Sequence, residues 1–285
     1  MVWRPSCWLH VCMMINSGRA ELAAESVGAG PPDILFVHSG VGDRREWGAV
    51  INVLSTGARC LSYDARGHGQ TRYQTEADWS PASDAIAVLD HYGVEQAIVI
   101  AASYGGRVAI DLALAHPDRV ARLALIAPAV SGAPAPEFDP PVRELDQQMD
   151  DADAAHDSDR LNQLEAQVWL DGAMQPEGRV SGAPRDLFLA MNGAVLTADD
   201  PGEARLAPDA WDRLEELTMP TVVMVGEHDL RHFRSNARHL GSTIPNARFV
   251  ELLGVAHLPH LEADATTIDE LATFALGQGP TGAAV

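Results

Sequence analysis

The stretch that decides the fold is AASYGG at residues 101–106, which lies between a buried-strand pattern at 97–101 and a helical pattern at 106–115. A sharp turn from strand to helix holds its central residue in a strained conformation and projects that side chain outward. Such a turn needs small residues two positions before and two after the centre, and an alanine and a glycine stand there. The helix that follows points free N–H groups toward the turn, which favours developing negative charge. The pattern therefore marks Ser103 as a candidate nucleophile, although a serine in a glycine-rich turn can also be merely exposed.

Short apolar runs alternate with helical patterns on both sides of this turn. The strand patterns cover residues 21–27, 33–38, 59–63, 97–101, 123–127, 221–225 and 248–252, and the helical patterns cover 47–54, 80–92, 106–115, 236–240 and 267–276. Fully apolar strands that alternate with helices predict a mostly parallel sheet with helices on both faces, the α/β class.

Residues 131–212 interrupt this alternation. They begin with a proline-rich linker and continue with helical patterns but no strand pattern, so we expect an inserted helical cap. The core is then expected at residues 18–130 and 213–280. Residues 1–17 are expected to be an extension outside the core, with a weak signal peptide as the alternative. Five aspartates at 150–159 are expected to be a solvated helix connection rather than a metal site.

Composition excludes several function classes. The chain has 285 residues, of which 46% are hydrophobic and 21% charged, a balance typical of a soluble globular protein. Its formal net charge of -20 would repel a nucleic-acid backbone, so no nucleic-acid partner is expected. All 20 basic residues are arginine, which excludes a Schiff-base lysine, a Ser–Lys dyad and a P-loop lysine. Three scattered cysteines predict a reducing, cytoplasmic location, and no apolar run is long enough to predict a membrane span.

Three further segments carry polar residues at strand ends. FVHSGVGD at 36–43 forms a flexible turn after a strand, GEHD at 226–229 follows another strand, and GVAHLPH at 254–260 follows a third. In parallel sheets the strand ends face one edge, where ligands bind. Asp229 and His257 are therefore expected at the same edge as Ser103.

These four motifs, in this order, resemble the α/β-hydrolase fold superfamily over residues 34–262. The YDARGHG segment at 63–69 also resembles a family motif. The resemblance implies a triad of Ser103 as nucleophile, Asp229 as acid and His257 as base, with no cofactor and no metal. It also implies an oxyanion hole made of backbone N–H groups of Tyr104 and Gly40.

Two positions depart from the family pattern. Ala101 replaces the first glycine of the serine turn, which costs little because alanine is also small. Ser39 replaces the glycine that usually follows His38, so Val41 is an alternative to Gly40 as an oxyanion donor.

The resemblance implies hydrolysis of a small to medium, fairly apolar carboxylic ester or lactone through an acyl-enzyme. It is closest to enol-lactone hydrolase-like and carboxylesterase-like members. A cofactor-free C–C bond hydrolase or a perhydrolase on the same triad is an alternative, and a ligand-binding receptor with little turnover is an alternative of another class. Association into a homo-oligomer is left open.

Other polar and aromatic residues near these motifs are candidates for either a functional or a structural role. Candidate substrate-pocket residues are Trp47, Tyr104, Trp169, Phe188 and Met191, and ordinary packing is an equal alternative for the last three. Residues expected to have structural roles are His38 in its loop, His260 in packing or in support of the site residues, Asp43 as a helix cap, and Asp64 with Arg66 as a turn-stabilising pair.

Overall fold

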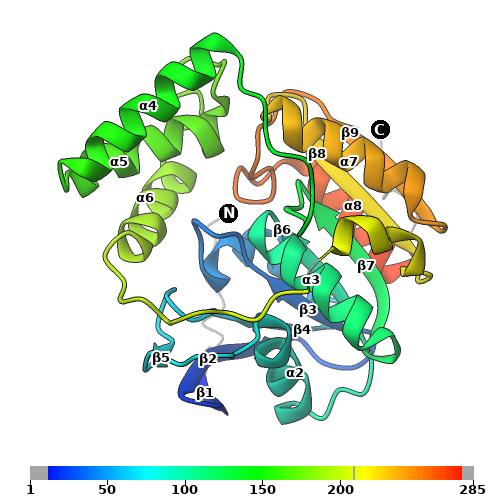
Figure 1. The fold of residues 1–285 in the computed structure, drawn as a ribbon. Coiled ribbons are helices and arrows are strands. Elements are labelled where there is room, and N and C mark those ends of the chain that lie inside the picture. Colours follow the sequence, from blue (N-terminus) through cyan, green and yellow to red (C-terminus); the bar gives the residue numbers. More distant parts are fainter. Residues whose placement is uncertain (1–11, 208, 278–285) are drawn as a thin grey trace, which may run out of the picture.

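The computed structural model describes residues 12–207 and 209–277, and these residues form a nine-stranded sheet at the centre of the molecule (Figure 1). The strands are β1 (Met13–Ser17), β2 (Ala20–Val27), β3 (Asp33–Val37), β4 (Arg59–Tyr63), β5 (Arg72–Tyr73), β6 (Ala97–Ala102), β7 (Val120–Ile126), β8 (Thr221–Gly226) and β9 (Ala247–Leu252). Their order is β1-β2-β4-β3-β6-β7-β8-β9, with β5 beside β2. In this order, each neighbouring pair in β4-β3-β6-β7-β8-β9 is parallel. The pairs of β2 with β1, β4 and β5 are antiparallel.

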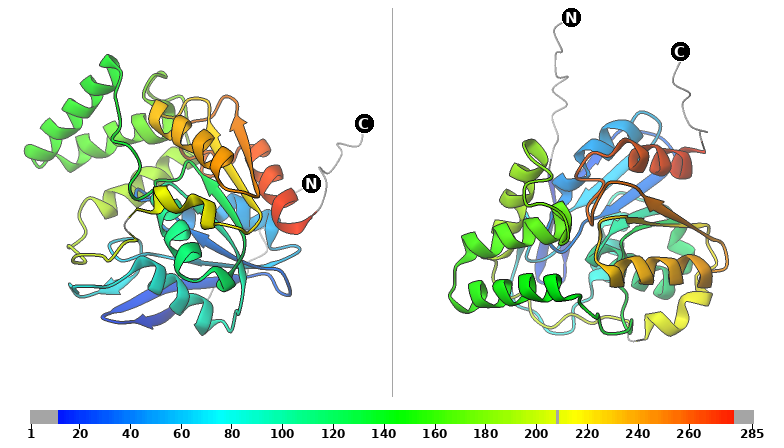
Figure 2. Two further views of the ribbon diagram at one scale, coloured as in Figure 1. Left: turned by 45° about the vertical axis from the view of Figure 1, so that its right-hand side comes forward. Right: turned by 90° about the horizontal axis from the view of Figure 1, so that it is seen from above.

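Helices cover both faces of this sheet, as the sequence predicts. On one face, α1 (Gly48–Leu54) packs against α8 (Ala265–Leu276). On the other lie α2 (Pro81–His91), α3 (Tyr104–Ala115) and α7 (Arg231–Thr243), an arrangement seen in Figures 1 and 2. Every residue of β6 and of β8 is buried, because both of their faces are covered.

The amino-terminal boundary differs from the expectation. Residues 13–17, assigned to an extension outside the core, form β1 and pair with β2 from Met13↔Ala24 to Ser17↔Ala20. Ile15 is buried in the main core cluster. The expected boundary after residue 17 is therefore wrong for these five residues, whose mixed composition hid an edge strand. Residues 1–11 lie outside the described residues.

The segment between β7 and β8 is helical. It contains α4 (Pro140–Ala154), α5 (Ser158–Glu165), a π-helix η3 (Ala166–Gly172) and α6 (Ala183–Val195). Figure 1 shows these helices to one side of the sheet, beyond its carboxyl edge. The 3₁₀-helix η4 (Ala210–Glu216) already packs in the main core cluster, so core packing resumes three residues before the expected position 213. The five aspartates at 150–159 are all exposed.

No helix within residues 12–207 and 209–277 is long and apolar enough to cross a membrane.

Candidate active site

Ser103 occupies the strained turn between β6 and α3. Its φ of 51° and ψ of -118° lie in a region that residues with a side chain rarely adopt. The turn leaves no room for larger neighbours: a Cβ on Gly105 would lie 2.4 Å from the carbonyl oxygens of Val37 and His38. The Ser103 N–H donates to the Ile126 carbonyl at 2.9 Å, which ties the turn to the end of β7. The sequence prediction of a sharp strand-to-helix turn at this serine is confirmed.

Asp229 and His257 are in direct contact. Asp229 follows β8, and His257 lies in the loop 253–264 between β9 and α8, which we call the histidine loop. The His257 Nδ1 lies 2.9 Å from Asp229 Oδ2 and 3.0 Å from Oδ1, and both side chains are only 1% exposed. The Leu230 N–H also donates to Asp229 Oδ1 at 2.7 Å and so orients the carboxylate.

The opposite nitrogen of His257 is unpaired. Its Nε2 is buried and has no hydrogen-bond partner among the described residues. The rings of Phe233 and Trp169 lie 4.4 and 4.9 Å from the imidazole ring, centroid to centroid. No hydrogen bond joins Ser103 to His257 in the part of the chain that the structure describes. The structure thus brings the acid and the histidine together at the edge of the sheet where the serine turn also lies.

Residues 38–42 follow β3 and lie against the serine turn, and we call them the oxyanion loop after the role that the sequence predicts for them. A Cβ on Gly40 would lie 3.3 Å from the Cβ of Tyr104, so the backbones of these two residues approach closely. His38 has both ring nitrogens occupied: Nδ1 lies 2.7 Å from the Ser39 carbonyl, and Nε2 accepts the Ala65 N–H at 2.9 Å. His38 is therefore a structural residue of the loop, as expected.

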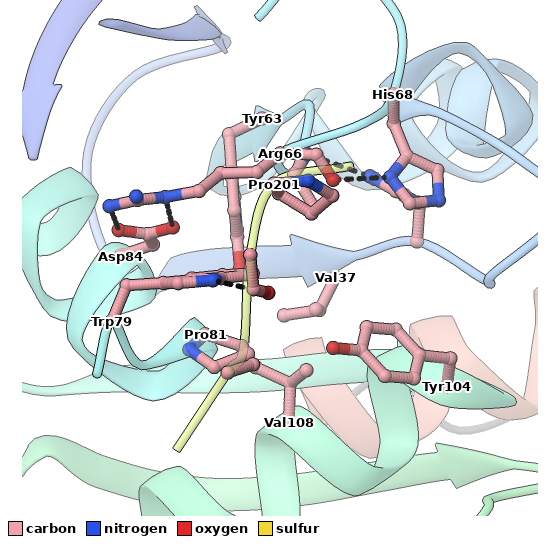
Figure 3. A pocket seen from close by; sticks show the side chains of 14 residues that line it. Val37, Tyr63, Arg66, His68, Trp79, Pro81, Asp84, Tyr104, Val108 and Pro201 are labelled. Atoms are coloured by element: carbon pink, nitrogen blue, oxygen red, sulfur yellow. Dashed lines mark hydrogen bonds and ion pairs between the residues drawn. The ribbon is translucent and has the colours of Figure 1, made fainter. Parts of the chain in front are cut away.

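A cavity of about 230 Å³ opens beside the oxyanion loop and the first turn of α3. Its wall is mostly apolar, and the lining residues that Figure 3 labels are Val37, Tyr63, Arg66, His68, Trp79, Pro81, Asp84, Tyr104, Val108 and Pro201. The Tyr104 ring reaches into the cavity with its hydroxyl at the inner end (Figure 3). Burial raises the pKa of this phenol, which keeps it neutral. Tyr104, which lines the cavity, directly follows Ser103 in the sequence.

The charged residues of the cavity wall, Arg66 and Asp84, form an ion pair with each other. The Arg66 guanidinium donates from Nε to Asp84 Oδ2 at 2.9 Å and from Nη2 to Oδ1 at 3.1 Å. It also pairs with Glu76 and lies over the Trp79 ring at 4.6 Å. Because these contacts occupy its nitrogens, Arg66 presents no free cation to a ligand.

The expected pairing of Asp64 with Arg66 is wrong. The Asp64 carboxylate binds the Arg44 side chain and accepts N–H groups of Arg44 and Gln70, whereas Arg66 pairs with acids further along the chain. Although Asp64 and Arg66 are only two positions apart, their side chains therefore bind different partners. Asp43 does cap a helix, since it accepts the Arg45 N–H at the start of η1 (Arg44–Trp47).

Of the five pocket candidates, Tyr104 lines this cavity, whereas Trp47, Trp169, Phe188 and Met191 do not. Trp47 is fully buried in the main core, and Phe188 and Met191 are buried in a small cluster with Leu258 and other residues of η3 and the histidine loop. Trp169 differs, because it is only partly buried and packs against His257. A role for these residues in binding substrate stays a prediction.

Sequence reasoning missed two groups of residues around the site. Phe233 of α7 packs on His257, and the cavity is closed by residues 201–204 of the segment after α6, whose Gly202 carbonyl accepts the Trp79 indole N–H at 3.1 Å. Nothing in the local sequence of residues 201–204 indicates that this segment returns to the region around Trp79. Only the three-dimensional contact reveals that role.

Comparison with known proteins agrees with this arrangement. Residues 32–264 match the family model described as the alpha/beta hydrolase fold. The chain is 27% identical over 278 residues to rhodomycin D methylesterase DauP of Streptomyces sp. (strain C5), covering 86% of this chain and 91% of that one. It is 26% identical over 265 residues to Protein PHYLLO, chloroplastic, of Arabidopsis thaliana, covering 84% of this chain but only 15% of that longer protein.

A thermophilic esterase from Thermogutta terrifontis is similar in structure, with a TM-score of 0.71 and 22% identity over 94% of this chain and 98% of the esterase. That likeness concerns the fold. The family match covers most of the chain, so this protein belongs to the α/β-hydrolase fold family and is a hydrolase of that class.

Proposed function

We propose that this hydrolase cleaves small to medium carboxylic esters or lactones, with Ser103 as nucleophile, His257 as general base and Asp229 as the acid that orients the histidine. The observation that carries the proposal is the buried Asp229–His257 pair at the same sheet edge as the strained Ser103 turn, with the Nε2 of His257 left unpaired. An imidazole held at Nδ1 by a carboxylate can accept a proton only at Nε2.

Each step uses a group at this edge of the sheet. The Ser103 hydroxyl attacks the substrate carbonyl while His257 takes the hydroxyl proton at Nε2. Asp229 stabilises the resulting imidazolium, which then donates its proton to the leaving alcohol. Water attacks the acyl-enzyme by the same route and releases the carboxylic acid, and Ser103 regains its proton.

Backbone N–H groups would stabilise the tetrahedral oxyanion. The N–H of Tyr104 lies at the start of α3, where the helix dipole also favours negative charge. The N–H of Gly40, or of Val41, would supply the second donor from the oxyanion loop. Each donor of this kind contributes about 3 kcal/mol to transition-state stabilisation.

The cavity supports a substrate with a modest apolar group. Its aromatic and aliphatic walls favour a hydrocarbon portion, and its charged residues Arg66 and Asp84 are already paired. The similarity to a protein described as a methylesterase and to one described as an esterase supports ester chemistry.

The test is a panel of p-nitrophenyl esters of increasing acyl length together with simple lactones. We expect turnover by the wild type, and a fall of kcat by a factor of at least about 1000 in Ser103→Ala, with an unchanged melting temperature. A Ser103→Ala variant that keeps more than about a tenth of the activity would remove Ser103 from its role.

A second variant tests the cavity. Val108→Phe adds bulk to the wall, so it should lower kcat/KM for longer acyl chains by about tenfold and leave acetate nearly unchanged. A kcat/KM equal to that of the wild type at every chain length would show that the substrate does not enter this cavity.

A further inference from the structure

We propose that Glu46 and His260 form a positioning pair that fixes the oxyanion loop (38–42) against the histidine loop (253–264). This inference rests on the proposed function, because it assigns the pair to the alignment of the oxyanion donors with His257.

The contacts of Glu46 join the two loops directly. Its Oε1 accepts the backbone N–H of Ser39 at 2.9 Å and lies 3.0 Å from Nε2 of His260. Its Oε2 accepts the Ser39 hydroxyl at 2.7 Å. One carboxylate therefore holds the oxyanion loop by two hydrogen bonds and the histidine loop by a third, at a point three residues from His257.

The pair is shielded from water. The side chains of Glu46 and His260 are both 0% exposed, and the Trp47 ring stacks on His260 at 4.2 Å. Burial alone would raise the pKa of Glu46, but the interactions with His260, His38 and Ser39 outweigh burial and hold this pKa below its usual value. Glu46 is thus an ionised acceptor whose hydrogen bonds lie in a low-dielectric interior, where they hold geometry firmly.

The backbone of the oxyanion loop is shaped around this carboxylate. A Cβ on Gly42 would lie 1.9 Å from Oε2 of Glu46, so only glycine leaves room for it. The Ser39 N–H is committed to Glu46 and cannot point at an oxyanion. This leaves Gly40 and Val41 as the loop's donors. Val41 in turn packs on the cluster that contains Leu258 of the histidine loop.

Ser39 gains a specific role from these contacts. Glycine at this position would keep the N–H bond to Glu46 but lose the hydroxyl bond, and it would free the local backbone. The serine hydroxyl adds a second anchor, so a loop of small residues is held at two points. A positioning role predicts losses in kcat with little change in KM, because the donors act mainly in the transition state.

The test compares Glu46→Ala, Glu46→Gln and Ser39→Ala, with kcat expressed per active site after titration with a fluorophosphonate. Glu46→Ala should lower kcat by about 30-fold, with KM changed less than about threefold. Glu46→Gln should recover to within about fivefold of the wild type, since its carbonyl oxygen can accept from Ser39 and His260 and its amide can donate to the Ser39 hydroxyl. Ser39→Ala should lower kcat by about three- to tenfold.

A tetrahedral analogue separates positioning from general stability. Benzeneboronic acid forms a tetrahedral adduct on an active serine, so its inhibition constant should rise in parallel with the fall in kcat. Asp33→Asn is the matched control, because it disrupts the Asp33–Arg59 pair at the opposite end of β3 and β4. This control should lower the melting temperature and leave kcat and the inhibition constant unchanged.

Each outcome decides the proposal. If Glu46→Ala folds and keeps kcat within twofold, the pair is structural only and the inference is overturned. If Glu46→Ala does not fold, Ser39→Ala decides, and an unchanged kcat and inhibition constant there overturn it. Ser103→Ala is measured in the same series: if it stays active, the proposed function itself fails, whereas an inactive Ser103→Ala with unaffected Glu46 variants rejects the positioning pair alone.

Discussion

Two buried carboxylate–imidazole pairs lie three residues apart on the histidine loop, and they use opposite nitrogens of the ring. His257 is bound through Nδ1 by Asp229 at 2.9 Å and leaves Nε2 unpaired. His260 is bound through Nε2 by Glu46 at 3.0 Å and leaves Nδ1 without a hydrogen-bond partner among the described residues. Burial and partner type are nearly the same in the two pairs, so neither property distinguishes them.

The surroundings make the difference. The Asp229–His257 pair packs against the partly buried Trp169 and lies at the sheet edge where the Ser103 turn also lies. The Glu46–His260 pair stacks on Trp47 in the main core, and its carboxylate is fully used by Ser39 and His260. The position of each pair, rather than the burial of its free nitrogen, therefore supports the proposal that the Asp229–His257 pair transfers protons and that the Glu46–His260 pair fixes loop geometry.

The largest expected effect comes from disrupting the Asp229–His257 pair. Asp229→Asn should lower kcat by a factor of about 10³ to 10⁴, because an amide donor beside Nδ1 favours the wrong imidazole tautomer. Glu227→Gln is the matched control, since Glu227 lies in the same turn but accepts the N–H of Gly254 instead. Steady-state kinetics on one ester should show at most a threefold loss for Glu227→Gln. A greater loss in Glu227→Gln than in Asp229→Asn would show that the acid is misassigned.

The two tryptophans that pack on the two histidines sharpen the comparison. If the acyl chain also contacts Trp169, as the sequence predicts, Trp169→Ala should change the ranking of acyl chain lengths by about tenfold, because removing a large group next to His257 shifts differential binding by about 1–3 kcal/mol. Trp47→Phe should lower the melting temperature, since Trp47 is fully buried, and should leave that ranking unchanged. Both variants are measured on the same ester panel and by thermal denaturation. An unchanged ranking in Trp169→Ala would remove Trp169 from the substrate site.

The smallest expected effect concerns a third histidine that touches the oxyanion loop. Nε2 of His68 lies 3.1 Å from the Gly40 carbonyl, and burial lowers the pKa of His68 from 6.5 to about 4. The unfolded chain therefore binds a proton at His68 before the folded chain does, so this contribution to stability is present above pH 6.5 and is lost as the pH falls toward 4. Between pH 6.5 and 5, the unfolding free energy should fall by about 1–2 kcal/mol more in the wild type than in His68→Gln. Urea titrations at the two pH values measure this difference, and equal slopes for the two proteins would contradict it.

The parts of the site that are specified locally could be predicted from the sequence. The Ser103 turn needs only a buried strand, two small residues and a helix in immediate succession. Asp229 and His257 each follow an apolar strand, and parallel strands deliver their ends to one edge. For the same reason the alternation of elements predicts the mostly parallel sheet.

The remaining features depend on contacts between distant segments. Glu46 meets His260 across 214 positions, and residues 201–204 meet Trp79 across more than 120. The sequence around these residues gives no indication of their distant partners. Trp47 lies near the oxyanion loop in sequence, yet its ring turns into the core, and β1 is an edge strand whose mixed residues give only a weak pattern. Side-chain direction and long-range pairing are decided by packing, which the order of residues does not reveal.

The most direct test of the central claim is covalent labelling with a fluorophosphonate followed by peptide mass mapping. The account predicts one adduct per chain, located on Ser103 and absent from Ser103→Ala. Labelling should be slowed at least about 100-fold in His257→Ala, because the hydroxyl loses its base, and nearly unchanged in Asp33→Asn. An adduct on another residue, or a folded wild-type protein that takes up no label, would contradict the assignment of Ser103 and His257 and would favour a ligand-binding role for the fold.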